Sequence, residues 1–243
     1  MRLSASRLLA GGLLAMSLGL APALAESASA APARPSHAGN EAVWLAHVTL
    51  TPDGSHLIGN PDAPVKLVEY MSYTCPHCAH FEAEGMPRLR LTGLASGKVS
   101  LEVRHFLRDP VDTTVALLTN CAPPQRFFGL HDLFLRTQPK WLAEASKHAG
   151  DQQQRWFNGP MPQRMRAIAG DLGFYDLMES QGIGRVAADR CLANEAMLKK
   201  LAEQTARAST PSFEGTPSFA INGLMLAGTH DWNSLEPQLN ARL

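Results

Sequence analysis

A CxxC motif placed directly after an apolar segment constrains the fold of this chain more than any other feature. The segment, residues 65–71, reads VKLVEYM, and the motif at residues 75–78 is CPHC. β-Branched and aromatic side chains predict a central strand at 65–71, and residues 79–94 continue as a helix. Because residues 99–106 alternate as a second strand, we expect a βαβ unit with parallel strands and a right-handed crossover.

The residues of the motif suit thiol chemistry. Cys75 would lie at the helix N-terminus, where free N–H groups and the helix dipole lower a thiol pKa from about 8.5. Pro76 fits the first helical turn, and His77 adds a donor beside the sulfur. The three-residue step returns Cys78 to the same face, within reach for a disulfide. We therefore expect Cys75 to be the exposed nucleophile and Cys78 the buried resolving thiol.

Two other interpretations of the motif stay open. It could be half of a zinc site, but structural zinc needs four ligands, and the remaining cysteines, Cys121 and Cys191, are single residues far apart. It could be a purely structural disulfide, but so small a ring is labile rather than stabilising. We expect no metal and no cofactor.

The first 25 residues have the composition of a secretory signal peptide. Two arginines and no acidic residue precede the apolar run 8–21, and residues 23–25, ALA, supply a cleavage site. The run is short for about 30 Å of hydrocarbon and Pro22 ends it, which disfavours an uncleaved membrane anchor. Cleavage would leave 20 basic and 22 acidic side chains, a net charge of −2. That balance excludes the basic signature of nucleic-acid binding, and export places the cysteines in an oxidising compartment.

The rest of the chain divides by its residue pattern. Residues 26–43 are rich in Ala, Ser and Pro, which predicts a flexible leader, and residues 44–51 predict a strand. The pattern from 109 to 210 is helical, with helices expected at 113–121, 125–136, 139–148, 162–172, 184–192 and 194–208. Asn222-Gly223 between two apolar runs predicts a hairpin, and a last helix should begin near Asp231.

A second signal, Thr216-Pro217, opens the first strand of that hairpin. With it the chain resembles the DsbA family of thioredoxin-fold disulfide oxidoreductases over residues 44–243. The resemblance rests on the strand leading into CPHC, the segment GTPSF, the helical block and the signal peptide. It implies an α/β thioredoxin fold with an inserted all-helical domain: first part 44–108, insertion 109–210, second part 211–243.

The resemblance also implies roles for single residues. His77 would stabilise the thiolate of Cys75, and Pro217 would be a cis proline beside it. A cis proline there would present the backbone of Thr216 to an extended substrate chain through strand-like hydrogen bonds. Glu69 matches the buried acid that accepts a proton near the resolving sulfur, although by itself it could be a solvated strand-edge acid.

Thr216 departs from the family pattern, because the best-known oxidases carry valine before the cis proline. Threonine there also occurs in isomerases, so an isomerase or a reductase remains an alternative. The stretch between the leader and the strand at 65–71 is too short for the dimerisation domain of isomerases of this fold, which favours a monomeric oxidase. An alternative from another class is a chaperone-like module that holds unfolded chains beside Pro217.

We therefore expect a periplasmic oxidase that donates the Cys75–Cys78 disulfide to reduced or unfolded exported proteins. The resemblance implies a quinone-linked membrane protein as its reoxidising partner. We also expect Cys121 and Cys191 to pair, because both lie in the helical block and the compartment is oxidising; two buried free cysteines are the alternative.

Overall fold

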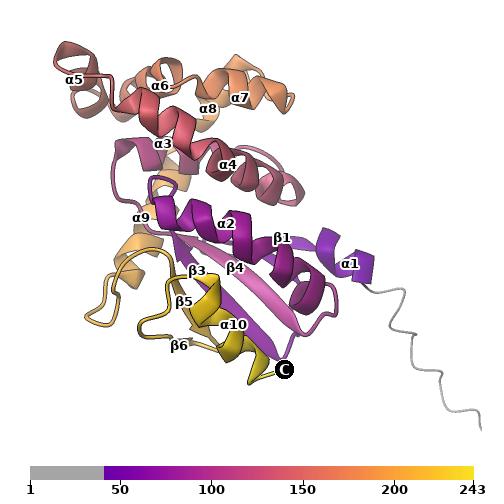
Figure 1. Ribbon diagram of the computed structural model, residues 1–243. Coiled ribbons are helices and arrows are strands. Elements are labelled where there is room, and N and C mark those ends of the chain that lie inside the picture. Colours follow the sequence, from indigo (N-terminus) through magenta and orange to yellow (C-terminus); the bar gives the residue numbers. More distant parts are fainter. Residues whose placement is uncertain (1–40) are drawn as a thin grey trace, which may run out of the picture. The chain divides into compact units, whose positions relative to one another are not determined.

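A six-stranded mixed sheet organises the computed structural model, which describes residues 41–243 (Figure 1). The strand order is β1-β2-β4-β3-β5-β6, so the sequence predicts the α/β class correctly. The strands are β1 Val48–Leu50, β2 His56–Gly59, β3 Val65–Met71, β4 Val99–His105, β5 Ser218–Ile221 and β6 Leu224–Met225. Only β3 and β4 are parallel; the other neighbouring pairs are antiparallel. The predicted signal peptide lies outside the described residues.

The predicted βαβ unit is confirmed. Strand β3 leads into helix α2, Pro76–Leu89, and a short π-helix, η2 Arg90–Leu94, before the chain returns as β4. β3 and β4 pair in parallel from Val65 opposite Val99 to Met71 opposite His105. Because β4 lies on one side of β3 and β5 on the other, β3 is an interior strand, and the site that follows it is built at the centre of the sheet.

The prediction for residues 44–51 is only partly right. A helix, α1 Glu41–Ala46, comes first and includes the last residues of the predicted leader, and β1 follows it. The indole of Trp44 packs directly on Gly97, so closely that a Cβ at this position would clash with it. No local sequence pattern predicts this tertiary contact. Strand β2 escaped prediction because its buried residues include a histidine, His56, which breaks the apolar alternation.

The segment between β4 and β5 is helical, as its pattern predicts. Its helices are α3 Pro110–Thr119, η3 Pro124–Arg126, α4 Phe127–Ala145, α5 Asp151–Phe157, α6 Met161–Asp171, α7 Phe174–Ser180, α8 Arg185–Cys191 and α9 Glu195–Ala208. The pattern missed α5 and α7, which are single short helices of 7 residues each. No helix among residues 41–243 is long and apolar enough to cross a membrane.

The two helices predicted on either side of position 138 are one helix, which corrects the expected break at Pro139. Proline removes one backbone N–H from a helix, but the buried face of α4 continues on both sides of it. Trp141 is 3 % exposed, and its Nε1 donates to the carbonyl of Phe134 at 3.0 Å. Packing thus holds α4 together where the local signal predicts a junction.

Cys121 and Cys191 form a disulfide with an S–S distance of 2.05 Å and a sequence separation of 70. This is the pairing that the sequence predicts. It joins the segment that follows α3 to the end of α8, and so links the beginning and the later part of the helical segment.

The hairpin and the last helix also agree with the sequence. Asn222 and Gly223 have φ values of 52° and 83°, as a type I′ turn requires, and Asn222 Oδ1 accepts from the N–H of Lys66 at 2.8 Å. Helix α10, Trp232–Asn240, begins with Asp231 as its N-cap. In α2, a Cβ on Gly85 would meet Trp232, so α10 packs closely on α2.

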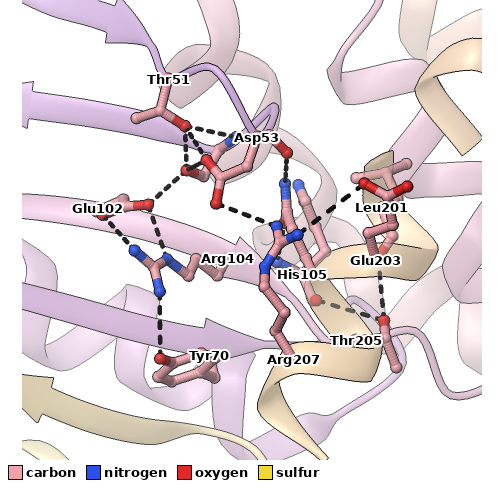
Figure 2. Close-up of polar contacts among 12 residues, drawn as sticks. Thr51, Asp53, Tyr70, Glu102, Arg104, His105, Leu201, Glu203, Thr205 and Arg207 are labelled. Carbon is pink, nitrogen blue, oxygen red and sulfur yellow. Dashed lines mark hydrogen bonds and ion pairs between the residues drawn. The ribbon is translucent and has the colours of Figure 1, made fainter. Parts of the chain in front are cut away.

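A polar cluster lies between β3, β4, the turn after β1 and α9 (Figure 2). Arg104 Nε lies 2.7 Å from Glu102 Oε1, and its Nη1 lies 3.4 Å from the hydroxyl of Tyr70. Nη2 of Arg207, in α9, donates to Oδ2 of Asp53, in the turn after β1, at 3.1 Å. The contact of Arg207 with Asp53 joins the end of the helical segment to the turn after β1.

Candidate active site

The CPHC motif lies where β3 ends and α2 begins. Cys75 is the N-cap of α2 with an extended backbone, and Pro76 is the first helical residue, as predicted. The N–H of Cys78 bonds to the carbonyl of Cys75 at 3.2 Å. Both cysteines carry free thiols, at a helix N-terminus where backbone N–H groups favour an anion.

The expectation that Cys75 is exposed is wrong. Cys75 is 3 % exposed and Cys78 0 %. Thr216 lies against the sulfur, and its carbonyl oxygen accepts a hydrogen bond from the protonated Sγ of Cys75 at 3.0 Å. Access to this sulfur comes instead through a cavity of about 400 Å³ lined by Cys75, Pro76, His77, Phe106, Arg108, Gly215 and Thr216.

The pKa values of the two thiols are shifted in opposite directions. A hydrogen bond from the Cys78 thiol, together with the Thr216 side chain and the N–H groups of Cys78 and His77, lowers the pKa of Cys75 to about 5 against the opposing effect of burial. Burial raises the pKa of Cys78, and the hydrogen bond to Cys75 and the charges of Cys75 and Glu69 add to it. At neutral pH Cys75 is therefore the thiolate and Cys78 the thiol.

His77 acts on Cys75 through its backbone N–H. Its side chain is exposed and lines the cavity at Cys75 as well as a second cavity behind residues 214–216. The family-based expectation assigned the stabilising effect to the imidazole. The structure adds a main-chain contribution that follows from the position of His77 in the first turn of α2.

Glu69 lies in β3 and is 1 % exposed, so it is not a solvated strand-edge acid. Neither carboxyl oxygen has a hydrogen-bond partner among the described residues. Burial raises the pKa of Glu69 well above its usual range, and the charges of Glu82 and Cys75 act in the same direction. A buried carboxyl with a raised pKa therefore stands near the thiol pair.

Two residues of the helical segment hold the active-site turn, and no sequence pattern identifies either as part of the site. Gln138, in α4, donates from Nε2 to the carbonyls of Tyr73 at 2.6 Å and Cys75 at 2.9 Å. Asp112, in α3, accepts from the Ser72 hydroxyl at 2.6 Å and the Tyr73 N–H at 2.8 Å. A sequence signal marks Asp112 only as part of a helix start, DPVD, and Gln138 carries no signal.

Opposite the motif, the peptide bond between Thr216 and Pro217 is cis, as the resemblance implied. Pro217 directly precedes β5, whose residue Phe219 pairs with Glu69 of β3. The pairing of β3 with β5 therefore places Thr216, just before β5, next to Cys75, which follows β3. Within residues 41–243 there is no group of three His, Cys, Asp or Glu side chains arranged to hold a metal ion.

A family model described as thioredoxin matches residues 51–241. Among curated proteins, one from Rickettsia conorii, provisionally named a protein-disulfide oxidoreductase, is 30% identical over 188 residues, or 76% of this chain and 60% of that protein. The chain therefore spans about three fifths of the length of that relative. A similar Rickettsia felis protein is 28% identical over 193 residues, or 79% of this chain and 61% of that protein.

Solved structures agree with the fold. A crystal structure described as a protein-disulfide isomerase from Novosphingobium aromaticivorans is 54% identical, covers 78% of this chain and 97% of that one, and has a TM-score of 0.75. The DsbA1 protein of Wolbachia pipientis shares the fold with a TM-score of 0.60 at 19% identity, over 76% of this chain and 88% of that one. The thioredoxin fold that the resemblance implied is thereby confirmed.

Proposed function

The chain belongs to the thioredoxin family, and on that premise we propose that it is an exported thiol:disulfide oxidoreductase that passes a Cys75–Cys78 disulfide to client proteins. The observation that carries the proposal is the opposed acidity of the two thiols. The pKa of Cys75 is lowered to about 5, whereas that of Cys78 is raised. Such a pair differs from a structural disulfide, because its reduced form is stabilised as a thiolate.

The reaction is a two-step exchange that starts from the disulfide form. A client thiolate attacks Sγ of Cys75, the Cys75–Cys78 bond breaks, and Cys78 leaves and takes up a proton. The second client thiol, after losing its proton, attacks the client sulfur of the mixed disulfide, and Cys75 leaves as a thiolate. Two electrons pass from the client to the cysteine pair, and one disulfide is exchanged for another.

A low pKa of Cys75 drives this exchange toward client oxidation. Each unit by which the thiol pKa is depressed favours the thiolate by about 1.4 kcal/mol. For a two-electron couple about 30 mV corresponds to that same energy, so a stabilised thiolate makes the disulfide a stronger oxidant. Burial of Cys75 beneath Thr216 limits the attack to thiols that enter the cavity beside it.

Glu69 supplies the proton that the buried leaving group requires. Cys78 is 0 % exposed, so water does not reach it directly. Burial raises the pKa of Glu69, and once Glu69 has given up its proton its charge raises the pKa of Cys78. We assign Glu69 as the group that exchanges a proton with Cys78 in both directions of the reaction.

The client is held by the backbone of the Thr216–Pro217 segment. An extended chain that lies along Thr216 would gain strand-like hydrogen bonds while its cysteine reaches Cys75. The predicted signal peptide supports a periplasmic location, and the resemblance supports reoxidation by a quinone-linked membrane protein. We propose that the protein works as a monomer on reduced or unfolded exported proteins.

The deciding experiment measures the equilibrium constant of the Cys75–Cys78 pair with glutathione and, in parallel, the oxidation of a dithiol peptide. An oxidase should equilibrate at a potential well above the thioredoxin value of about −270 mV and should oxidise the peptide stoichiometrically. A potential at the thioredoxin end would instead assign a reductase. The chaperone-like module would be assigned by two results together. The wild type would show no oxidase activity, and the Cys75→Ala variant would still protect an unfolded client from aggregation.

Isomerase activity is the second candidate. Thr216 before the cis proline and the 54% identity to a structure described as a protein-disulfide isomerase both favour it. An isomerase should rescue a client with scrambled disulfides when its own cysteines start reduced. An oxidase acts only on reduced clients when its cysteines start oxidised, so the two starting states separate the candidates.

A further inference from the structure

His230 contacts the segment that carries Thr216 at two points. We call residues 214–217, which precede β5, the threonine loop. Nδ1 of His230 lies 2.7 Å from the carbonyl oxygen of Pro217, and Nε2 lies 3.3 Å from Oε2 of Glu214. Because a carbonyl oxygen only accepts, Nδ1 must carry the proton of the shorter contact. One imidazole thus spans the threonine loop from its first residue to its last.

Glu214 is itself fixed from a second direction. The same Oε2 accepts from the N–H of Gly228 at 2.8 Å. That hydrogen bond, followed by the contact with His230, lowers the pKa of Glu214, so the carboxylate is charged at neutral pH. Two residues after β6 therefore hold both ends of the threonine loop. Gly228 and His230 bind the carboxylate of Glu214, and His230 also binds the carbonyl of Pro217.

Thr216 lies between those two anchored ends and touches the reactive sulfur. Its carbonyl lies 3.0 Å from Sγ of Cys75 and accepts a hydrogen bond only from the protonated thiol, whereas its side chain is among the groups that lower the pKa of Cys75. The loop also forms the wall between two cavities, of about 400 and 410 Å³, which share His77, Gly215 and Thr216. A displacement of the loop would alter the contact at Cys75 and the surface offered to a client together.

We propose that His230, oriented by Glu214, is a positioning residue that holds the threonine loop against Cys75. It does not touch the sulfur, and it acts through the carbonyl of Pro217 and the neighbouring Thr216. The consequence for client turnover rests on the proposed oxidase function, whereas the consequence for the acidity of Cys75 does not.

The test uses three variants of the full chain. His230→Leu removes both contacts, His230→Asn keeps a donor at the position of Nδ1, and Glu214→Gln keeps the acceptor for Gly228 without the charge. His80→Leu is the matched control, because His80 lines the same cavity but is 68% exposed and pairs with Glu84 instead of the loop. Each is examined by thiolate absorbance titration of Cys75, by kinetics with a dithiol peptide and by the rate of reduction with dithiothreitol.

In His230→Leu we expect the Cys75 titration midpoint to rise by about one unit, because the loosened loop would withdraw the Thr216 side chain from the thiolate. One unit corresponds to the loss of about one hydrogen bond to a charged group. KM for the peptide should rise about tenfold, while the rate with dithiothreitol, which needs no strand-like contact, stays within about twofold. His230→Asn should recover most of both losses, and His80→Leu should behave as wild type.

An unchanged midpoint and KM in a folded His230→Leu protein would overturn the proposal, as would equal changes in His80→Leu. If His230→Leu does not fold, His230→Asn and Glu214→Gln decide: wild-type behaviour of both contradicts a positioning role for the pair. A shifted midpoint in a protein whose wild type oxidises no peptide would overturn the oxidase proposal and leave the positioning role standing.

Discussion

The Nε2 atom of Gln138 donates to the carbonyl oxygen of Cys75 at 2.9 Å, and so a helix of the inserted segment holds the residue that carries the reactive sulfur. The same amide group holds the carbonyl of Tyr73 at 2.6 Å. All three residues are buried. The helical segment is thus part of the active-site scaffold as well as a cover for it.

Gln138→Ala should therefore destabilise the protein and disturb the active-site turn. It leaves the buried carbonyl of Tyr73 without its side-chain donor, at a cost of about 1–3 kcal/mol, and leaves the carbonyl of Cys75 with the backbone N–H donors of α2. Urea unfolding measures the loss, and the rate of alkylation of Cys75 reports the turn. Gln163→Ala, at an exposed position of α6, is the control and should change neither quantity. Equal stability of the two variants would contradict the scaffold role.

Cys78→Ala should raise the pKa of Cys75, because it removes the donor that contributes most to the low value. Cys78→Ser keeps a hydroxyl donor at the same place, so its shift should be the smaller one. Thiolate absorbance between pH 3 and 9 measures both. If the two variants titrate at the wild-type midpoint, the backbone N–H groups and Thr216 suffice to hold the thiolate.

The reduced protein should gain stability relative to the oxidised protein as the pH rises from about 5 to about 8.5. The folded state releases the proton of Cys75 near pH 5, whereas the unfolded chain keeps it until about 8.5. Across that window the unfolded state binds more protons, so the free energy of unfolding rises with pH and falls again as the pH drops through 5. Thermal melts of both redox forms at several pH values check this.

Only the difference between the two redox forms is informative in that experiment, since Asp112 titrates in both. Burial raises the pKa of Asp112 to about 7. A carboxyl with a raised pKa lowers the protein's free energy of unfolding as the pH rises. A Cys75→Ser protein supplies the control, because its stability should lack the rise between pH 5 and 8.5. A redox difference that stays constant with pH would show that Cys75 is not a thiolate.

Glu69→Leu should stabilise the protein and slow its turnover. The buried carboxyl has no hydrogen-bond partner among the described residues, and its replacement by an apolar side chain removes a burial cost of about 1–3 kcal/mol. The loss of the proton acceptor should slow exchange at Cys78 most above neutral pH. Lys66→Leu, at an exposed position of the same strand, controls for the added leucine. Unchanged peptide oxidation by Glu69→Leu would remove Glu69 from the mechanism.

Replacing Cys121 and Cys191 together by serine should lower the free energy of unfolding by about 4 kcal/mol on the chain-entropy model, since the bond closes a loop across 70 positions. The Cys75 titration should be unaffected. Urea unfolding of the double variant, with the wild type under non-reducing conditions as reference, measures the loss. A loss below about 1 kcal/mol would mean that helix packing alone holds this segment.

The sequence predicts the parts of the site that local chemistry determines. CPHC at a strand–helix junction identifies both thiols and the place of Pro76, and Asn222-Gly223 identifies the hairpin. It predicts neither the burial of Cys75 nor the supporting residues Gln138 and Asp112, because those depend on which distant segments pack on the motif. Pro139 shows the same limit in reverse, since buried contacts of α4 override a strong local breaker signal.

The contact between Cys75 and Thr216 joins residues 141 positions apart. Closing contacts of this kind costs more chain entropy than forming local helices or the β3–α2–β4 unit. A chain that emerges N-terminus first thus lacks the contact of Thr216 with Cys75 until β5 pairs with β3, whereas the Cys78 thiol and the N–H groups at the start of α2 are already beside the sulfur. Completion of the sheet therefore adds a cover and a binding surface, the Thr216–Pro217 segment, to a thiol pair whose acidity is set mainly at the β3–α2 junction.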